Sequence, residues 1–151
     1  MTEGSKLDAI KIDPEQKVSN WSRCTVKSRV EDAISVTFEN DSYHCDRGMN
    51  IYSHDIAKYG TKTQEDYEWR ASLQVGDLID CYDSTQYWYA STVIGREMRP
   101  FKGEQIEMVY VALRVMHPDG DQTDDKGNKF FGWSDSFDEW MPLHSARITR
   151  Y

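Results

Sequence analysis

An internal repeat constrains the fold of this chain more than any other feature of its sequence. Residues 38–59 align without a gap with residues 130–151, and seven of the twenty-two aligned positions are identical. Further upstream, Trp21 of the first copy matches Trp88 of the second. Two copies of one short pattern are typical of tandem domains that share a fold. The sequence therefore predicts two related units.

Each copy contains three stretches that are rich in β-branched and aromatic residues, which favour strands. Turn-forming residues separate these stretches. We predict a mainly β fold of two small, strongly bent antiparallel barrels, residues 1–60 and 71–151, joined by a polar linker at residues 61–70. About sixty residues make only a marginal core, so we expect the barrels to share apolar surface. The expected strands are Asp8–Asp13, Trp21–Val26, Ile34–Phe38, Val75–Cys81, Trp88–Ile94 and Val109–Met116.

The segment Lys129–Trp140, KFFGWSDSFDEW, is the densest aromatic stretch of the chain. Phe130, Trp133 and Phe137 fall within eight residues, among turn formers that could face water without them. Taken singly, each ring is best explained as core of a small β domain, because aromatic side chains dominate core packing. Taken together at a strand end, next to Asp135, Asp138 and Glu139, the rings have the composition of an aromatic cage for a cation.

Between Leu73 and Tyr151 the chain carries a WY pair, a strand, and then the motif F-x-G-W-S-x-x-aromatic-D-E-W. The matching positions are Trp88, Tyr89, Val93, Phe130, Gly132, Trp133, Ser134, Phe137, Asp138, Glu139 and Trp140. This pattern resembles the chromo-barrel and Tudor-like family. The resemblance implies a small bent barrel that acts as a binding module. It also implies that the walls of an aromatic cage are Tyr89, Phe130, Trp133 and Phe137.

We expect Tyr82 or Asp135 at the rim of this cage. The chain departs from the family at the polar stretch HPDGDQTDDKGNK, which separates the strand Val109–Met116 from Phe130. If this insertion displaces Phe130, the cage loses one wall. The first copy has Ser22, Phe38, Asp41 and Cys45 at the four cage positions. One ring cannot enclose a cation, so we expect the second copy alone to bind one.

The residues that close the motif are expected to have structural roles. Asp138 aligns with Asp46 of the first copy, and an acid in a turn before a strand commonly accepts hydrogen bonds from backbone amides. We expect Trp140 to buttress the barrel and Glu139 to be exposed.

The whole chain is also similar to tandem modules that precede the catalytic domain in some ubiquitin-specific proteases. The similar segments are VGDLIDCYDSTQYWYASTVI, the acidic insertion, and FGWSDSFDEWMPLHSARI. This similarity implies an accessory, non-catalytic segment. Two functions therefore stay open. One is the capture of a methylated lysine in a basic protein segment, such as a histone tail, and the other is protein interaction or structural support without a cage.

The charge of the chain favours a basic protein partner. Its formal net charge is −8, and each half has more acidic than basic residues. Neither half has the basic footprint that binding to a phosphate backbone requires, which argues against a nucleic acid as partner. The first residues lack the apolar region of a signal peptide, and no apolar stretch is long enough for a membrane span. We expect an intracellular protein, nuclear or cytoplasmic, and the sequence makes no prediction of oligomeric state.

Catalytic and metal-binding patterns are absent from the sequence. It has no nucleophile elbow, P-loop, HExxH or GxGxxG, and its four histidines lack ligand spacing. The three cysteines form no CxxC pair, and the acidic insertion lacks the glycine and the terminal glutamate of a calcium-binding loop. We therefore expect no catalytic residues, no metal and no cofactor, and an enzyme is the weakest class of function.

Overall fold

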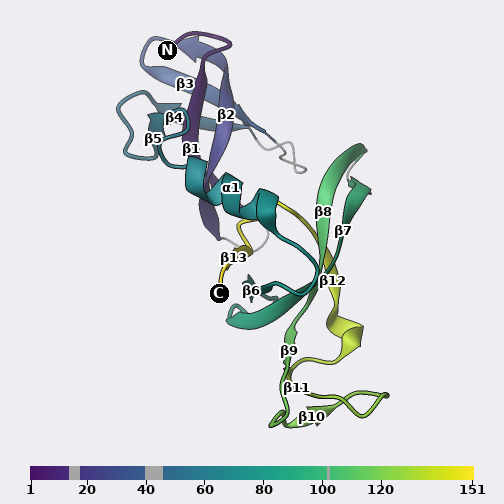
Figure 1. The fold of residues 1–151 in the computed structure, drawn as a ribbon. Coiled ribbons are helices and arrows are strands. Elements are labelled where there is room, and N and C mark those ends of the chain that lie inside the picture. The colour runs from purple at the N-terminus through teal and green to yellow at the C-terminus, as the bar shows by residue number, and fades with distance from the viewer. Residues whose placement is uncertain (14–17, 40–45, 102) are drawn as a thin grey trace. The chain divides into compact units, whose positions relative to one another are not determined.

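The computed structural model describes residues 1–13, 18–39, 46–101 and 103–151. Within these residues the chain is mainly β, as the sequence predicts, with thirteen strands, one α-helix and one short 3-10 helix (Figure 1). The chain divides into two compact units. Unit 1 comprises Met1–Ser72 and Phe101–Glu104, and unit 2 comprises Leu73–Pro100 and Gln105–Tyr151.

Unit 1 contains a curled five-stranded sheet in the order β4-β3-β2-β1-β5. The paired strands are antiparallel, and β2 bends at a register shift between Val26 and Ser28. The polar run 27–32 lies between two of the expected strands; it continues β2 and turns at Glu31, whose φ is 54°. The strands are β1 (Lys6–Ile12), β2 (Ser19–Val30), β3 (Ala33–Phe38), β4 (Arg47–Asn50) and β5 (Ile56–Lys58).

One face of this sheet forms the core of unit 1. Cross-strand partners share a face, so the pairs Leu7–Cys24 and Ile34–Met49 point the same way. The buried cluster on this face consists of Ala9, Cys24, Val26, Ile34, Val36, Phe38 and Met49. We call the opposite face of β1–β2, which carries Asp8 and Arg23, the outer face of unit 1.

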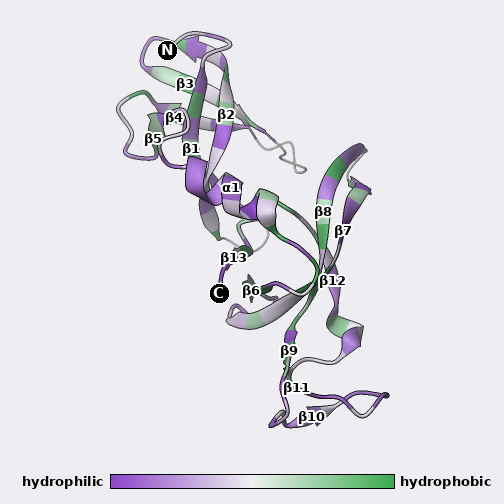
Figure 2. Cartoon of the chain, in the orientation of Figure 1, coloured by the Kyte–Doolittle hydropathy of each residue, from purple (hydrophilic) through white to green (hydrophobic). Residues whose placement is uncertain are grey.

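The segment 61–70, expected as a linker, contains most of helix α1 (Gln64–Ser72) and belongs to unit 1. Glu65 and Asp66 in its first turn and Arg70 in its last turn favour a helix, because they complement the helix dipole. Helix α1 is hydrophilic along most of its length (Figure 2). Its polarity alone therefore did not distinguish it from a linker.

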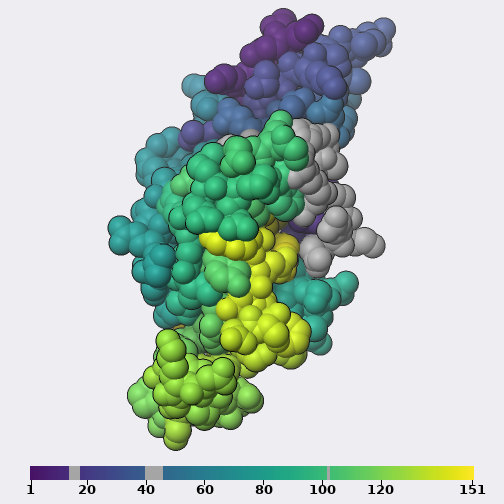
Figure 3. Space-filling view, turned by 90° about the vertical axis from the view of Figure 1, so that its right-hand side faces the viewer, coloured from purple at the N-terminus to yellow at the C-terminus, as the bar shows by residue number. Residues whose placement is uncertain are grey.

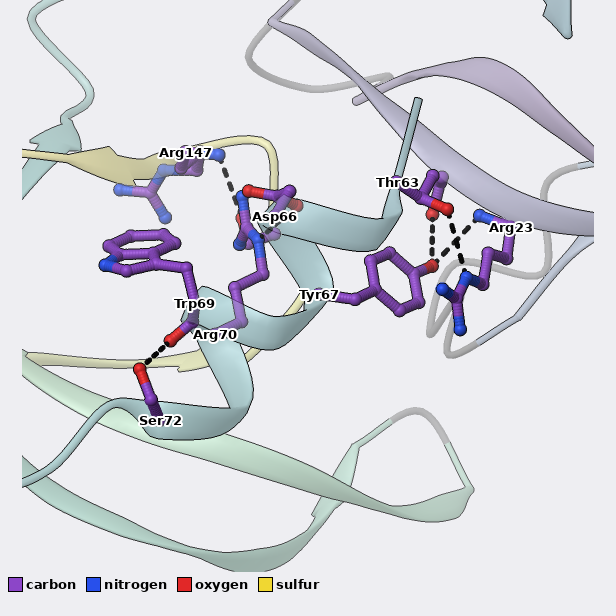
Figure 4. Close-up of polar contacts among 10 residues, drawn as sticks. Arg23, Thr63, Asp66, Tyr67, Trp69, Arg70, Ser72 and Arg147 are labelled. Atoms are coloured by element: carbon purple, nitrogen blue, oxygen red, sulfur yellow. Dashed lines mark hydrogen bonds and ion pairs between the residues drawn. The ribbon is translucent and has the colours of Figure 1, made fainter. Parts of the chain in front are cut away.

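Hydrogen bonds to a buried acid hold the start of α1 on the outer face of unit 1. The Asp8 carboxylate accepts the backbone N–H groups of Gly60 at 3.0 Å and Lys62 at 2.9 Å, and the Thr63 hydroxyl at 3.0 Å. Thr63 in turn accepts the Arg23 Nε–H at 3.0 Å, and the hydroxyl oxygen of Tyr67 accepts the Arg23 backbone N–H at 2.9 Å (Figure 4). Polar contacts therefore fix α1 to unit 1.

Unit 2 contains a second curled five-stranded sheet, in the order β12-β8-β7-β6-β13. A three-stranded sheet in the order β10-β11-β9 and the 3-10 helix η1 (Asp135–Phe137) lie between β8 and β12 in sequence. In Figure 3 part of this insertion forms a lobe of its own at one end of unit 2. The strands are β6 (Leu78–Tyr82), β7 (Trp88–Phe101), β8 (Glu104–Ala112), β9 (Arg114–Met116), β10 (Gln122–Thr123), β11 (Lys129–Gly132), β12 (Glu139–Pro142) and β13 (Ile148–Arg150).

The two five-stranded sheets have the same strand order when β1 to β5 are matched with β6, β7, β8, β12 and β13. The registers agree as well. Ala9 pairs with Ser22 and Ile56, and Cys81 pairs with Tyr89 and Ile148. Ser22 and Tyr89 therefore occupy equivalent positions, as the sequence repeat predicts.

The gap-free alignment is wrong at Phe38 and Phe130. Phe38 lies in β3 and pairs with Cys24, whereas Phe130 lies in β11 of the inserted sheet. Because Met49 pairs with Ile34 and Met141 pairs with Val109, the position equivalent to Phe38 is Leu113. The insertion begins before Phe130, which explains the error. Of the other expected first-copy positions, Asp41 and Cys45 lie outside the described residues.

Replacing Asp8 with alanine should destabilise the protein. The change leaves two backbone N–H groups and the Thr63 hydroxyl without their buried acceptor, at a cost of about 1–3 kcal/mol. Urea denaturation followed by circular dichroism measures the loss. Asp80→Ala is the matched control, because Asp80 has the equivalent register position in unit 2. This substitution should change the free energy of unfolding by no more than about 0.5 kcal/mol, as is usual at a surface site. Equal losses in the two variants would contradict the assigned role of Asp8.

Candidate functional site

Three of the four residues expected to form a cage lie together in unit 2. The Tyr89 and Trp133 ring centroids are 5.9 Å apart at an interplanar angle of 80°, and those of Trp133 and Phe137 are 5.2 Å apart at 55°. We call Tyr89, Trp133 and Phe137 the aromatic cluster. Its rings are inclined to one another rather than stacked, so their faces point in different directions.

The aromatic cluster is open to solvent on part of its surface. Phe137 is 53% exposed, and Tyr89 and Trp133 are half-buried. Tyr89 lies on the core-facing side of β7, where its cross-strand partner is the fully buried Cys81. The cluster therefore adjoins the end of the core, and a ligand could reach the exposed parts of its rings.

A glycine fixes the position of Trp133. Gly132 has a φ of 119°, and a Cβ atom at this position would overlap the backbone carbonyl oxygen of Leu113. This close approach lets the Trp133 N–H donate to that oxygen at 2.8 Å. Glycine is the residue that adopts such a conformation without steric cost. The GW pair of the motif thus anchors the cluster at the junction of β8 and β9.

The turn after Trp133 places Phe137 beside the indole ring. The Phe137 N–H donates to the carbonyl oxygen of Ser134 at 3.1 Å, and this bond forms part of η1. The Ser134 and Ser136 hydroxyl oxygens lie 2.9 Å apart. The turn therefore brings the rings of Trp133 and Phe137, which are four residues apart in the sequence, into direct contact.

The turn between β6 and β7 supports the Tyr89 side of the cluster. The buried Asp83 carboxylate accepts the Thr85 N–H at 2.9 Å and the Thr85 hydroxyl at 2.6 Å. The Thr85 and Tyr89 hydroxyl oxygens are 3.4 Å apart. The sequence predicts a turn at Asp83-Ser84, but it does not indicate that Asp83 and Thr85 support Tyr89.

Phe130, the fourth expected wall, does not contact the other three rings. It is 4% exposed, and its ring centroid lies 6.0 Å from the guanidinium carbon of Arg114. Phe130 and Arg114 line a polar cavity of about 420 Å³ at the inserted sheet. The other residues that line this cavity are Thr123, Asp124, Asp125, Lys126, Asn128, Ser134 and Asp135.

The two expected rim residues lie in different places. Asp135 is exposed, lies two residues from Trp133, and lines the polar cavity. Tyr82 pairs with Trp88 on the face of the sheet opposite Tyr89, and the two ring centroids are 5.3 Å apart. Because neighbouring residues of a strand point to opposite faces, the register separates Tyr82 from the cluster.

An ion pair holds the end of the insertion. The Arg114 guanidinium donates to Asp138 at 2.5 Å, and the Asp138 side chain is only 6% exposed. Asp138 therefore pairs with a cation of β9, and the expectation that it accepts backbone amides is wrong. The expected roles of its neighbours agree with the structure. The Trp140 ring stacks on the Tyr110 ring with their centroids 4.8 Å apart, and the exposed Glu139 pairs with Arg147.

The described titratable groups with shifted pKa values include two buried thiols and one acid of the insertion. Burial raises the pKa of the Cys24 and Cys81 thiols to about 12, so neither forms a thiolate nucleophile at neutral pH. Hydrogen bonds from the Asn128 backbone, above all, lower the pKa of Asp124, which closes the β10–β11 turn. No group of His, Cys, Asp and Glu side chains in the described ranges could hold a metal ion. None of the described helices is both long and apolar enough for a membrane span.

No protein-family model and no curated protein matches this chain. Among solved structures, it is similar to the four MBT repeats of Drosophila melanogaster Sfmbt, crystallised in complex with a peptide containing methylated lysine. The alignment has a TM-score of 0.30 and 18% identity, and it covers 99% of this chain and 38% of that chain. A likeness of this size carries no argument about function.

Replacing Gly132 with alanine should disturb the cluster. The added methyl group overlaps the Leu113 carbonyl, so the variant should lose about 3 kcal/mol of stability and its Trp133 side-chain NMR signal should shift. Gly127→Ala is the control, because it has a φ of 82° but its added methyl meets nothing within 4 Å. Gly127→Ala should destabilise the protein by only about 1–2 kcal/mol, because alanine is strained in the left-handed conformation. Equal costs would show that the contact with Leu113 is unimportant.

Replacing Asp138 with asparagine should lower the melting temperature. Removing the charge leaves a largely buried guanidinium without its carboxylate, at a cost of about 1–3 kcal/mol. Glu139→Gln tests the neighbouring ion pair, which is partly exposed and should contribute less than about 1 kcal/mol. Differential scanning calorimetry compares the two variants. A smaller loss for Asp138→Asn than for Glu139→Gln would refute the role of the Arg114 pair.

Proposed function

We propose that this chain is a non-catalytic recognition module that binds a basic protein segment through the aromatic cluster. The observation that carries the proposal is the grouping of Tyr89, Trp133 and Phe137 as inclined, partly exposed rings, with the exposed Asp135 two residues from Trp133 in the sequence. Such rings attract a cation through their electron-rich faces, and a nearby carboxylate adds charge attraction. The proposed ligand is the methylated ammonium group of a lysine, because its methyl groups also gain from apolar contact.

The proposed site consists of three rings, with Asp135 at its rim. Phe130 does not contact these rings and lines the polar cavity, which Ser134 and Asp135 also line. Each ring over a desolvated cation contributes about 0.5–2 kcal/mol, so three rings support binding in roughly the micromolar range or weaker. Residues that flank the lysine must supply the remaining affinity. The net charge of −8 favours basic flanking residues, as in a histone tail.

Unit 1 is not proposed to bind such a ligand. Ser22 occupies the position equivalent to Tyr89, and its hydroxyl lies 3.2 Å from the Tyr67 hydroxyl of α1. The Tyr67 hydroxyl of α1 thus lies against the residue that stands at the position of Tyr89. Within the described residues, unit 1 therefore has no aromatic ring at the position of Tyr89.

A cage-less interaction segment, such as an accessory part of a ubiquitin-pathway protein, is the second candidate function. The direct contacts between the three rings favour it, because rings that fill one another's faces leave less surface for a cation. The two candidates differ in one respect that can be measured. A reader prefers a methylated lysine over an unmodified one, and a cage-less segment does not.

Titration with histone-tail peptides that carry trimethylated lysine should shift the NMR signals of Tyr89, Trp133 and Phe137. Trp133→Ala should weaken binding about tenfold, since it removes the ring that contacts the other two and a cation–ring contact of about 1–2 kcal/mol. Binding should also fall as salt rises, because exposed charges are screened. Trp88→Ala is the matched control, since this exposed ring lies on the opposite face of β7. Equal affinity for modified and unmodified peptides would favour the cage-less candidate, and no shift of these three residues would rule out the site.

A further inference from the structure

In unit 1, a segment of the chain covers the outer face of the sheet, which is the face opposite the core. The segment 60–72 lies on that face, with the Asp8 carboxylate bound to its first residues. The Arg23 guanidinium carbon lies 4.5 Å from the centroid of the Tyr67 ring. Asp8 is fully buried as a result.

Unit 2 has an acid at the equivalent position. Asp8 pairs with Arg23 in β2 and Ala57 in β5, and Asp80 pairs with Ala90 in β7 and Thr149 in β13. The matched strands and registers therefore make Asp80 the counterpart of Asp8. We call the side of β6–β7 that carries Asp80 the outer face of unit 2. Its other residues are Leu78, Tyr82, Trp88, Ala90 and Thr92.

The outer face of unit 2 is exposed. Leu78 is 40% exposed and Trp88 is 45% exposed, although both are large and apolar. Asp80 is half-buried, and its carboxylate makes no hydrogen bond or ion pair within the described residues. A patch of exposed apolar side chains around an unpaired acid is typical of an interaction surface.

We propose that the outer face of unit 2 binds the N-terminal turn of an α-helix from a partner protein. The first N–H groups of a helix have no acceptor within the helix, and they form its positive end. The Asp80 carboxylate complements them in charge and in hydrogen bonding. Asp8 makes a related contact in unit 1, where its carboxylate accepts the Lys62 N–H and the Thr63 hydroxyl immediately before the first residue of α1.

The side chains around Asp80 define the chemistry of the partner helix. Leu78 stands where unit 1 has Lys6, and Ala90 stands where unit 1 has Arg23. The partner helix therefore begins with Ser or Thr, which donates to Asp80 as Thr63 donates to Asp8. Its next turn carries an aliphatic residue in place of Tyr67, because Ala90 offers no guanidinium for a ring to stack on.

A peptide derived from α1 tests this proposal. The probe has the sequence of residues 60–72, GTKTQEDYEWRAS, with the substitution Tyr67→Leu, and it is added to the full chain labelled for NMR. We expect shifts at Leu78, Asp80 and Trp88. Asp80→Asn should weaken binding about tenfold, because it removes charged hydrogen bonds. A peptide that also carries Thr63→Val should bind more weakly for the same reason.

The controls separate this surface from the aromatic cluster. Trp133→Ala should leave binding of the helical peptide unchanged, whereas Trp88→Ala should weaken it, and circular dichroism checks that each variant is folded. The absence of shifts on the outer face of unit 2 would overturn the proposal. Shifts that survive both Asp80→Asn and Trp88→Ala, or that fall on β1–β2 instead, would overturn it too.

Discussion

A five-stranded sheet of about sixty residues has two faces, and one bent layer can enclose a core on only one of them. This constraint explains most of what the two units share and where they differ. In both units most inward residues of the first two strands are small or apolar, as Ala9, Cys24, Cys81 and Val93 are, and Tyr89 is an exception. The outward residues face either water or an added element. Unit 1 adds helix α1, whereas unit 2 adds an inserted sheet elsewhere and leaves its outer face exposed.

The inserted sheet creates the candidate site because it meets the parent sheet at one close backbone contact. Gly132 allows β11 to approach Leu113, and Trp133 then binds the Leu113 carbonyl. The same approach directs Phe130 toward Arg114, away from the three rings. This contact therefore brings Trp133 and Phe137 to Tyr89 and separates Phe130 from it.

Local sequence signals predicted six strand regions and the repeat, since β-branched runs and turn residues act over a few positions, but they did not predict short strands such as β4, β5 and β13. They also placed Trp133 and Phe137 near Tyr89, through the resemblance to a known family. The long-range features were not predictable in this way. The partner of Asp138 lies 24 residues away in β9, and the displacement of Phe130 depends on how a whole insertion folds. Helix α1 was missed because its contacts are polar and come from Asp8, far from it in sequence.

The two units differ at two neighbouring positions of their second strands, β2 and β7, and these two differences are linked. In unit 1 the Tyr67 hydroxyl lies against both Ser22 and the backbone of Arg23, so one helix residue covers the strand at these two positions. In unit 2 the equivalent residues are Tyr89 and Ala90. The Tyr89 ring turns toward Trp133, and a second tyrosine from a covering helix would compete with it for the same strand edge. A helix that covers unit 2 must therefore be smaller at this point than α1, which leaves the aromatic cluster free to bind a separate ligand.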